Sequence, residues 1–346
     1  MEEVTTVDGE AQTKSDDPVV IPDTPAEALG AAAEADDQEP VAPTRYFANI
    51  FPETPLPQEL GTLLWRLREV MDMPVWLLLQ GNAESPLGNV DELLVHWIKL
   101  NKEKLPTCDK VAVVVNSPGG RAVAAYELAR LLRRKCGGFV AVVPDEAMSA
   151  ATLLVLGADS IMMGPDSALG PLDAQIWDAE AESYTSVLNE VQALERLRAY
   201  SMESIDEAMV LLVNRTDKRV DSLLPHVLKF VSDSMRPLLE KIDVVHYNER
   251  ARILKVAEEY AVRLLRRKHP EPHRSGYHDK AREIATKLVE NYPEHGFRIH
   301  REEAASLGLE VATLTDEQDM ILEELWSAVQ DVTAVGLLQE APPNEE

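Results

Sequence analysis

The chain has 346 residues, 45% of them hydrophobic, so it can bury a sizeable core and wholesale disorder is excluded. Its 34 Lys and Arg residues face 60 Asp and Glu residues, and the resulting net charge of -26 repels nucleic acid and anionic membrane surfaces. With two cysteines and an acidic start in place of a basic, apolar leader, we expect a cytoplasmic protein with no nucleic-acid partner and no membrane span.

Residues 1–43 form a distinct acidic segment. They include 12 acidic residues and one lysine, a net charge of −11, and no aromatic residue. Such a segment cannot bury enough apolar surface to offset its ordering entropy, so we predict a disordered acidic tail. A second disordered tail is predicted over residues 336–346.

Between residues 44 and 180, apolar runs that suit strands alternate with segments of helical spacing. The run 111–115 is continuously apolar and β-branched, which is typical of a strand covered on both faces. This alternation predicts an α/β core built on a layered, mostly parallel sheet. Strands are expected at 75–80, 111–115, 139–143 and 160–163, and helices at 58–70, 90–100, 122–134 and 149–156.

Residues 181–335 are expected to add helices that complete the fold. The stretch 187–268 has almost no glycine and long helical periodicity, with interruptions predicted around Pro225 and Pro237. Further helices are predicted at 281–291 and 318–329. The long helices carry more apolar surface than a small sheet can cover, which favours a homo-oligomer.

Two motifs at neighbouring strand-to-helix junctions bring together groups suited to acyl transfer. The run 116–120, Asn-Ser-Pro-Gly-Gly, follows one predicted strand, and its glycines leave backbone N–H groups unshielded. Ser149 is predicted as the first residue of an apolar helix, where its hydroxyl is exposed and the next residue, Ala150, has a free N–H. The carboxyl ends of parallel strands share one edge, so these groups should meet there as a nucleophile and an oxyanion hole. Separately, the first motif also suits a plain turn and the second an ordinary helix N-cap.

The strings that carry these motifs resemble a known group of proteins. VAVVVNSPGG, VVPDEAMSAATLLVLGADSIMMGPDSALGPLDAQ and EHGFRIHREEAASLGLEV are similar to segments of the Clp protease and signal peptide peptidase A superfamily, and within it to the serine dehydrogenase proteinase family. The resemblance implies a Clp/crotonase-like fold and a serine peptidase that acts on a peptide or protein substrate. It also implies Ser149 as the nucleophile and Gly119 and Gly120 in the oxyanion turn.

The general base is where the sequence departs from this superfamily. The run 171–173 stands roughly where Clp proteases carry a histidine, and Asn189 stands nearest to the lysine of membrane-linked relatives. No lysine occurs between Lys135 and Lys218. His295 lies in a segment that matches the family, so it is the candidate base; its alternative role is to anchor a loop by hydrogen bonds.

Arg121 and Asp173 complete the predicted site. Arg121 follows Gly120 and could bind a substrate carboxylate, or it could face solvent and pair with Asp145 or Glu146. Asp173 follows a Gly-Pro turn and could orient a base or a backbone amide. His269, His273 and His278 could suggest a metal site, but no cysteine or close carboxylate pattern supports it, so neither a metal nor a cofactor is predicted.

The leading hypothesis is therefore a serine peptidase that cleaves peptide bonds with Ser149. The rival is a catalytically degenerate member that serves as an oligomeric scaffold or a peptide-binding module. Crotonase-type acyl-CoA chemistry is disfavoured, because it has no use for Ser149 and no acidic pair is placed to move protons. Substrate and oligomer size do not follow from the sequence.

Overall fold

The computed structural model describes residues 45–50, 56–57, 59–81, 84–85, 87–173, 175–178, 183–270 and 278–340. The predicted acidic tail at residues 1–43 and the end of the chain, residues 341–346, lie outside this part.

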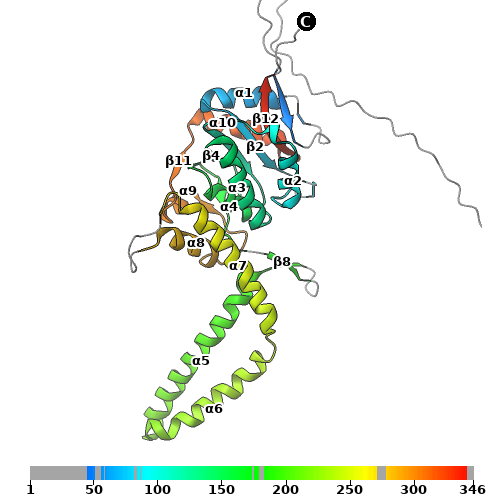
Figure 1. Ribbon diagram of the computed structural model, residues 1–346. Helices are drawn as coiled ribbons and strands as arrows, with labels where there is room; N and C mark the ends of the chain where they lie inside the picture. Colours follow the sequence, from blue (N-terminus) through cyan, green and yellow to red (C-terminus); the bar gives the residue numbers. More distant parts are fainter. Residues whose placement is uncertain are drawn as a thin grey trace, which may run out of the picture.

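A seven-stranded sheet forms the centre of the body, in the order β1-β12-β2-β3-β4-β6-β11 (Figure 1). Strands β2, β3, β4, β6 and β11 run parallel, and β12 is antiparallel to both β1 and β2. The predicted α/β architecture with a mostly parallel sheet is confirmed. The strands are β1 (Arg45–Asn49), β2 (Val75–Gln80), β3 (Val111–Asn116), β4 (Phe139–Val143), β6 (Ser160–Met163), β11 (Val311–Thr313) and β12 (Thr333–Glu340).

Helices cover both faces of this sheet. Along β3, Val113 packs in the apolar cluster beneath one helical layer, and Val114 packs in the cluster on the opposite face. Burial on both faces explains why the strand is uninterruptedly apolar. One layer holds α1 (Leu60–Met71) and α10 (Asp316–Val329); the other holds α2 (Glu92–Leu100), α3 (Ala122–Cys136), α4 (Ala150–Leu156), the inner part of α7 (Val244–Leu265) and α8 (Lys280–Glu290).

Several smaller elements lie outside the main seven-stranded sheet. A three-stranded sheet in the order β10-β7-β5 and a hairpin of two strands follow the core strands, and none of these was predicted. They are β5 (Glu146–Ala147), β7 (Ala168–Leu169), β10 (Ile299–His300), β8 (Gln175–Asp178) and β9 (Ser183–Ser186), with the short helices η1 (Lys102–Lys104) and α9 (Arg301–Ser306).

A helical arm projects from the body. Helix α5 (Val187–Thr216) runs outward, α6 (Val220–Leu239) packs along it, and α7 returns to the body (Figure 1). The expected interruptions at Pro225 and Pro237 were wrong, because both prolines lie inside α6. Each proline removes one helical hydrogen bond, because it has no N–H to donate to the carbonyl four residues earlier, but α6 continues through both and packs along α5.

The predicted C-terminal tail was also wrong over part of its length. Residues 336–340 belong to β12, which lies between β1 and β2 inside the main sheet. Apolar residues of β12 such as Val335 and Leu337 are buried there. A single strand that pairs with distant partners leaves little local signal, which is why the segment looked like a chain end.

None of the described helices is both long enough and apolar enough to cross a bilayer.

Candidate active site

Ser149 occupies a strained position between β5 and α4. Its backbone angles are φ +50° and ψ −114°, a region that residues other than glycine rarely adopt. An ordinary N-cap serine has extended backbone angles and accepts a hydrogen bond from the first turn. Ser149 has neither feature: it makes no side-chain cap, and its Oγ instead donates to the Asp173 main-chain carbonyl at 3.5 Å. A half-buried serine on a sharp strand-to-helix turn is the geometry of a nucleophile elbow.

Backbone hydrogen bonds attach this turn to the end of β3. Ser117 N donates to the Glu146 carbonyl at 3.0 Å, and Met148 N donates to the Ser117 carbonyl at 3.0 Å. The Asn116 side chain adds an acceptor for Glu146 N at 2.9 Å. The two motifs predicted at neighbouring junctions are therefore in direct contact.

Gly119 lies against the serine turn. Its φ is +104°, and a Cβ built on it would lie 2.4 Å from the Met148 carbonyl oxygen and 3.0 Å from Ser149 Cβ. Gly120 has φ +147°, and its Cβ would lie 2.3 Å from the Val90 carbonyl oxygen. Both positions therefore require glycine, for conformation and for space.

Two backbone N–H groups remain available beside Ser149. The Gly119 carbonyl accepts from Val90 N at 2.7 Å, and because a trans peptide sets C=O and N–H opposite, the Gly120 N–H points away from Val90. Ala150 is the first residue of α4, where the N–H has no helical acceptor. Neither N–H donates to an acceptor in the part of the chain that the structure describes. The Gly119 N–H, in contrast, is bound to Ser117 Oγ at 3.1 Å.

A buried chain of polar groups supports the glycine turn. The Gln80 amide donates to the Leu87 carbonyl at 2.5 Å and accepts from Ser117 Oγ at 2.5 Å, and Ser117 Oγ in turn receives the Gly119 N–H. Sequence reasoning missed Gln80. The sequence feature that could have identified it is a polar residue at the C-terminal end of the apolar run 75–80.

Asp173 connects the serine turn to the start of the arm. Its side chain is 3% exposed; Ser186 Oγ donates to Oδ2 and Leu188 N donates to Oδ1 at 3.2 Å. The carboxylate thus fixes the first turn of α5. The main-chain carbonyl of the same residue accepts from Ser149 Oγ, so Asp173 sets the position of the loop opposite Ser149.

His295 also interacts with Asp173. Burial lowers the pKa of its imidazole more than the carboxylate charge and a backbone hydrogen bond of Asp173 raise it. Its Nδ1 is buried without a hydrogen-bond partner in the described structure. Ser149 and His295, far apart in the sequence, therefore both interact with Asp173, and burial disfavours the protonated form of the histidine.

Two further residues of the predicted site, Arg121 and Asn189, are exposed to solvent. Arg121 pairs with Glu92 at 2.9 Å, so the alternative pairing with Asp145 or Glu146 was wrong. Those two carboxylates bind Arg298 instead, each at 3.1 Å.

Asn189 is exposed in the first turn of α5, and its backbone N–H donates to Ser186 Oγ at 3.3 Å. This position supplies no basic group. Among the described residues, no cluster of His, Cys, Asp and Glu side chains could hold a metal ion.

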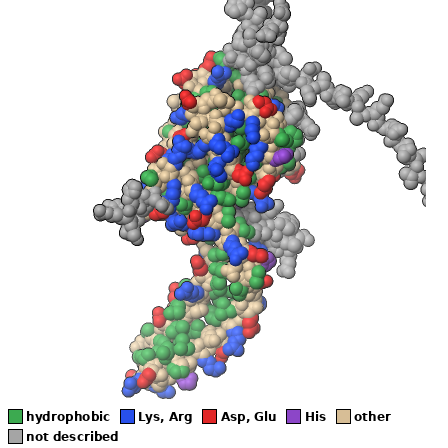
Figure 2. Space-filling model, viewed as in Figure 1, with side chains coloured by type: hydrophobic (Ala, Val, Ile, Leu, Met, Phe, Trp, Pro, Cys, Tyr) green, Lys and Arg blue, Asp and Glu red, His purple; other side chains and the backbone are tan. Residues whose placement is uncertain are grey.

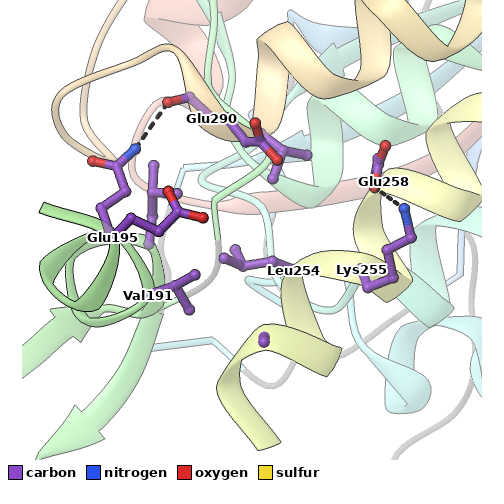
Figure 3. A pocket seen from close by; sticks show the side chains of 10 residues that line it. Val191, Glu195, Leu254, Lys255, Glu258 and Glu290 are labelled. Carbon is purple, nitrogen blue, oxygen red and sulfur yellow. Dashed lines mark hydrogen bonds and ion pairs between the residues drawn. The ribbon is translucent and has the colours of Figure 1, made fainter. Parts of the chain in front are cut away.

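A separate cavity of about 130 Å³ lies between α5, α7 and α8 (Figure 3). Apolar side chains such as Val191 and Leu254 line part of it. Glu258 binds Lys255, and Gln192 Nε2 donates to the Glu290 carbonyl at 3.1 Å. Burial, and then the charges of neighbouring carboxylates, raise the pKa of Glu290. None of the residues that line this cavity belongs to the Ser149 turn or the glycine turn.

The sequence is similar to those of several known proteins. Residues 92–245 match the family of ClpP-like SDH-type serine proteinases. Two uncharacterised proteins of Methanocaldococcus jannaschii are similar: one is 28% identical over 64% of this chain and 60% of its own length, the other 24% identical over 68% and 62%. The chain thus spans less than two thirds of these relatives.

A mutant of the 1510-N membrane-bound stomatin-specific protease is a similar solved structure. It shares 13% identity over 69% of this chain and 79% of its own, with a TM-score of 0.36. The resemblance inferred from the sequence is confirmed by the family match: residues 92–245, which include the Gly119–Gly120 turn and Ser149, are similar to the ClpP-like SDH-type serine proteinases.

Proposed function

We propose that the chain is a serine peptidase in which Ser149 attacks the carbonyl carbon of a peptide bond. The observation that carries the proposal is the strained backbone of Ser149, with φ +50° at a helix start where its hydroxyl caps nothing. Strain of this kind costs about 1–3 kcal/mol and persists where the surrounding structure imposes it, commonly at functional sites.

The oxyanion of the tetrahedral intermediate would be held by the N–H groups of Gly120 and Ala150. Both donors are fixed before substrate arrives, one by the bridge to Val90 and one by the helix. Preorganised donors of this kind account for about 10²–10³ in kcat each. The Ser149 proton passes to a base and then to the leaving amine; water hydrolyses the acyl-enzyme and restores the hydroxyl.

His295 is the proposed base. A lowered pKa keeps the imidazole unprotonated at neutral pH, as a base must be. In the unliganded arrangement Ser149 Oγ donates to the Asp173 carbonyl, so this hydrogen bond must pass to the imidazole when substrate binds. Arg121, exposed at the start of α3 beside Gly120, is the proposed contact for a substrate carboxylate.

One observation favours a second function, peptide binding without cleavage. The acceptor of Ser149 Oγ is a carbonyl oxygen, which cannot take a proton, and Asn189 stands where a lysine base is expected. A site with an intact oxyanion turn and no effective base would hold a peptide carbonyl without cleaving it.

We further propose that the protein is cytoplasmic and works as a homo-oligomer. The arm exposes large apolar side chains, among them Val210 at 62%, Phe230 at 65% and Val245 at 69%. Figure 2 shows this apolar surface on the outer part of the arm. A second copy of the chain would cover it.

Hydrolysis of a fluorescently labelled unfolded protein tests the choice between the two functions. We expect cleavage by the native chain and none by Ser149→Ala or His295→Ala. If His295→Ala cleaves as fast as the native chain, His295 is not the base. If the native chain is inert and Asn189→Lys gains activity, the peptidase proposal is wrong and the peptide-binding function stands.

A further inference from the structure

An arginine- and tyrosine-rich surface lies where α7 crosses α3. The rings of Tyr126 and Tyr260 stack with centroids 4.3 Å apart and planes 14° from parallel. Arg130 lies over the Tyr126 ring at 5.8 Å and Arg263 over the Tyr260 ring at 5.7 Å. Both tyrosines are only half-buried, so the surface consists of a central aromatic pair with a guanidinium at each end.

This surface is basic although the chain is strongly acidic. Figure 2 shows Lys and Arg side chains gathered over the middle of the body, where α3 and α7 run. Asp159 lies at its edge and already pairs with Arg133 at 3.3 Å and Arg267 at 3.4 Å. The basic residues are Arg130, Arg133, Arg134, Lys135, Arg263, Arg267 and Lys268.

Three of these arginines carry a positive charge that no ion pair in the described structure neutralises. Arg130, Arg134 and Arg263 are exposed and form no ion pair with any residue in the described ranges. Arginine and tyrosine are the residue types enriched at protein interfaces, and guanidinium groups suit carboxylates because they bind them with two parallel hydrogen bonds. The chemistry therefore fits an acidic peptide with a short apolar centre.

We propose that residues 16–23 of the same chain, Asp-Asp-Pro-Val-Val-Ile-Pro-Asp, dock on this surface. They are the one run of branched apolar residues within the acidic segment 1–43, and aspartates flank the run on both sides. Val19, Val20 and Ile21 contact the tyrosine pair, and the aspartates at either end meet the arginines. The pattern of the segment, charge–apolar–charge, thus mirrors that of the surface.

The connection to the body permits this contact. Twenty-two peptide units join Asp23 to Arg45, the start of β1, and a chain of that length reaches roughly 70 Å when extended. That reach exceeds the width of a small domain of about 30 Å. Tethering makes the contact intramolecular, so modest affinity suffices.

A nucleic acid is the other polyanion that a basic surface could take. It would approach a molecule of net charge -26 from solution and would be repelled by it. Salt screens this electrostatic repulsion. The tethered segment avoids that approach. The structure therefore favours the acidic segment.

Arginine footprinting of the full-length protein tests the proposal. Phenylglyoxal modifies exposed guanidinium groups, and mass spectrometry gives a rate for each residue, with the exposed Arg219 of the arm as reference. At low salt we expect Arg130, Arg134 and Arg263 to react several-fold more slowly in the native chain than in Asp16→Asn/Asp17→Asn/Asp23→Asn. The matched control Asp8→Asn/Asp36→Asn/Asp37→Asn, which removes the same charge elsewhere in the segment, should keep the native rates.

Three results would overturn the proposal. Equal rates in the native chain and the Asp16→Asn triple variant would show that the segment does not cover the surface. An equal rise in the control variant would show a general charge effect without docking of residues 16–23. Protection that an added oligonucleotide confers on the native chain, where none existed before, would assign the surface to nucleic acid.

Discussion

Gly119→Ala is the substitution for which the structure gives the sharpest expectation. The new methyl carbon would lie 2.4 Å from the Met148 carbonyl oxygen and 3.0 Å from Ser149 Cβ, whereas non-bonded carbon contacts normally lie at about 3.5–4.0 Å. The serine turn must therefore move by on the order of 1 Å, and a displacement of that size costs about 10²-fold in rate. The backbone at φ +104° adds strain of about 1–3 kcal/mol.

The assay follows the rate at which a fluorophosphonate labels the protein, together with thermal unfolding. We expect labelling to slow by about 10²-fold while the fold persists, since 1–3 kcal/mol is a fraction of the ~5–15 kcal/mol that holds a domain. Gly296→Ala is the matched control, because its methyl group meets nothing within 4 Å and it should label at the native rate. Native-rate labelling by Gly119→Ala would refute the claim that this turn fixes the nucleophile.

Three further predictions concern the pH dependence set by His295, the stability contributed by Asp173 and the oligomeric state. Because the pKa of His295 is lowered and the neutral form is the base, a pH–rate profile should rise with a midpoint below 6.5 and then plateau; a midpoint near the pKa of a lysine would exclude His295. Asp173→Ala removes the acceptor of Leu188 N and Ser186 Oγ, so chemical denaturation should show a loss of about 1–3 kcal/mol. Light scattering should give a mass well above 38.4 kDa, and a monomer at micromolar concentration would contradict the assembly proposal.

Much of the fold follows from local patterns in the sequence. The strands β2, β3, β4 and β6 are short apolar runs bounded by turns, and each was expected within a residue or two of its observed bounds. The contact between the glycine turn and Ser149 also follows, because parallel strands end at one edge. The strands depend on neighbouring residues in the chain, so the hydrophobic pattern of the sequence reveals them.

The remaining features depend on partners far apart in the sequence. Strand β12 is fixed by pairing with β1 and β2, and nothing in residues 333–340 alone names those partners. The meeting of His295 with Asp173 and the support of Ser117 by Gln80 depend likewise on tertiary packing. The role of the Asp173 main-chain carbonyl was beyond reach, because side-chain identity carries no information on which carbonyl faces a nucleophile.

The central claim is that Ser149 is an activated nucleophile and not a helix cap. Intact-mass measurement after incubation of the native protein with a fluorophosphonate tests it most directly, with Ser149→Ala beside it. We expect one adduct per chain, located by peptide mapping at Ser149 and absent from the variant. A native protein that stays unmodified, or an adduct that persists in Ser149→Ala, would contradict it.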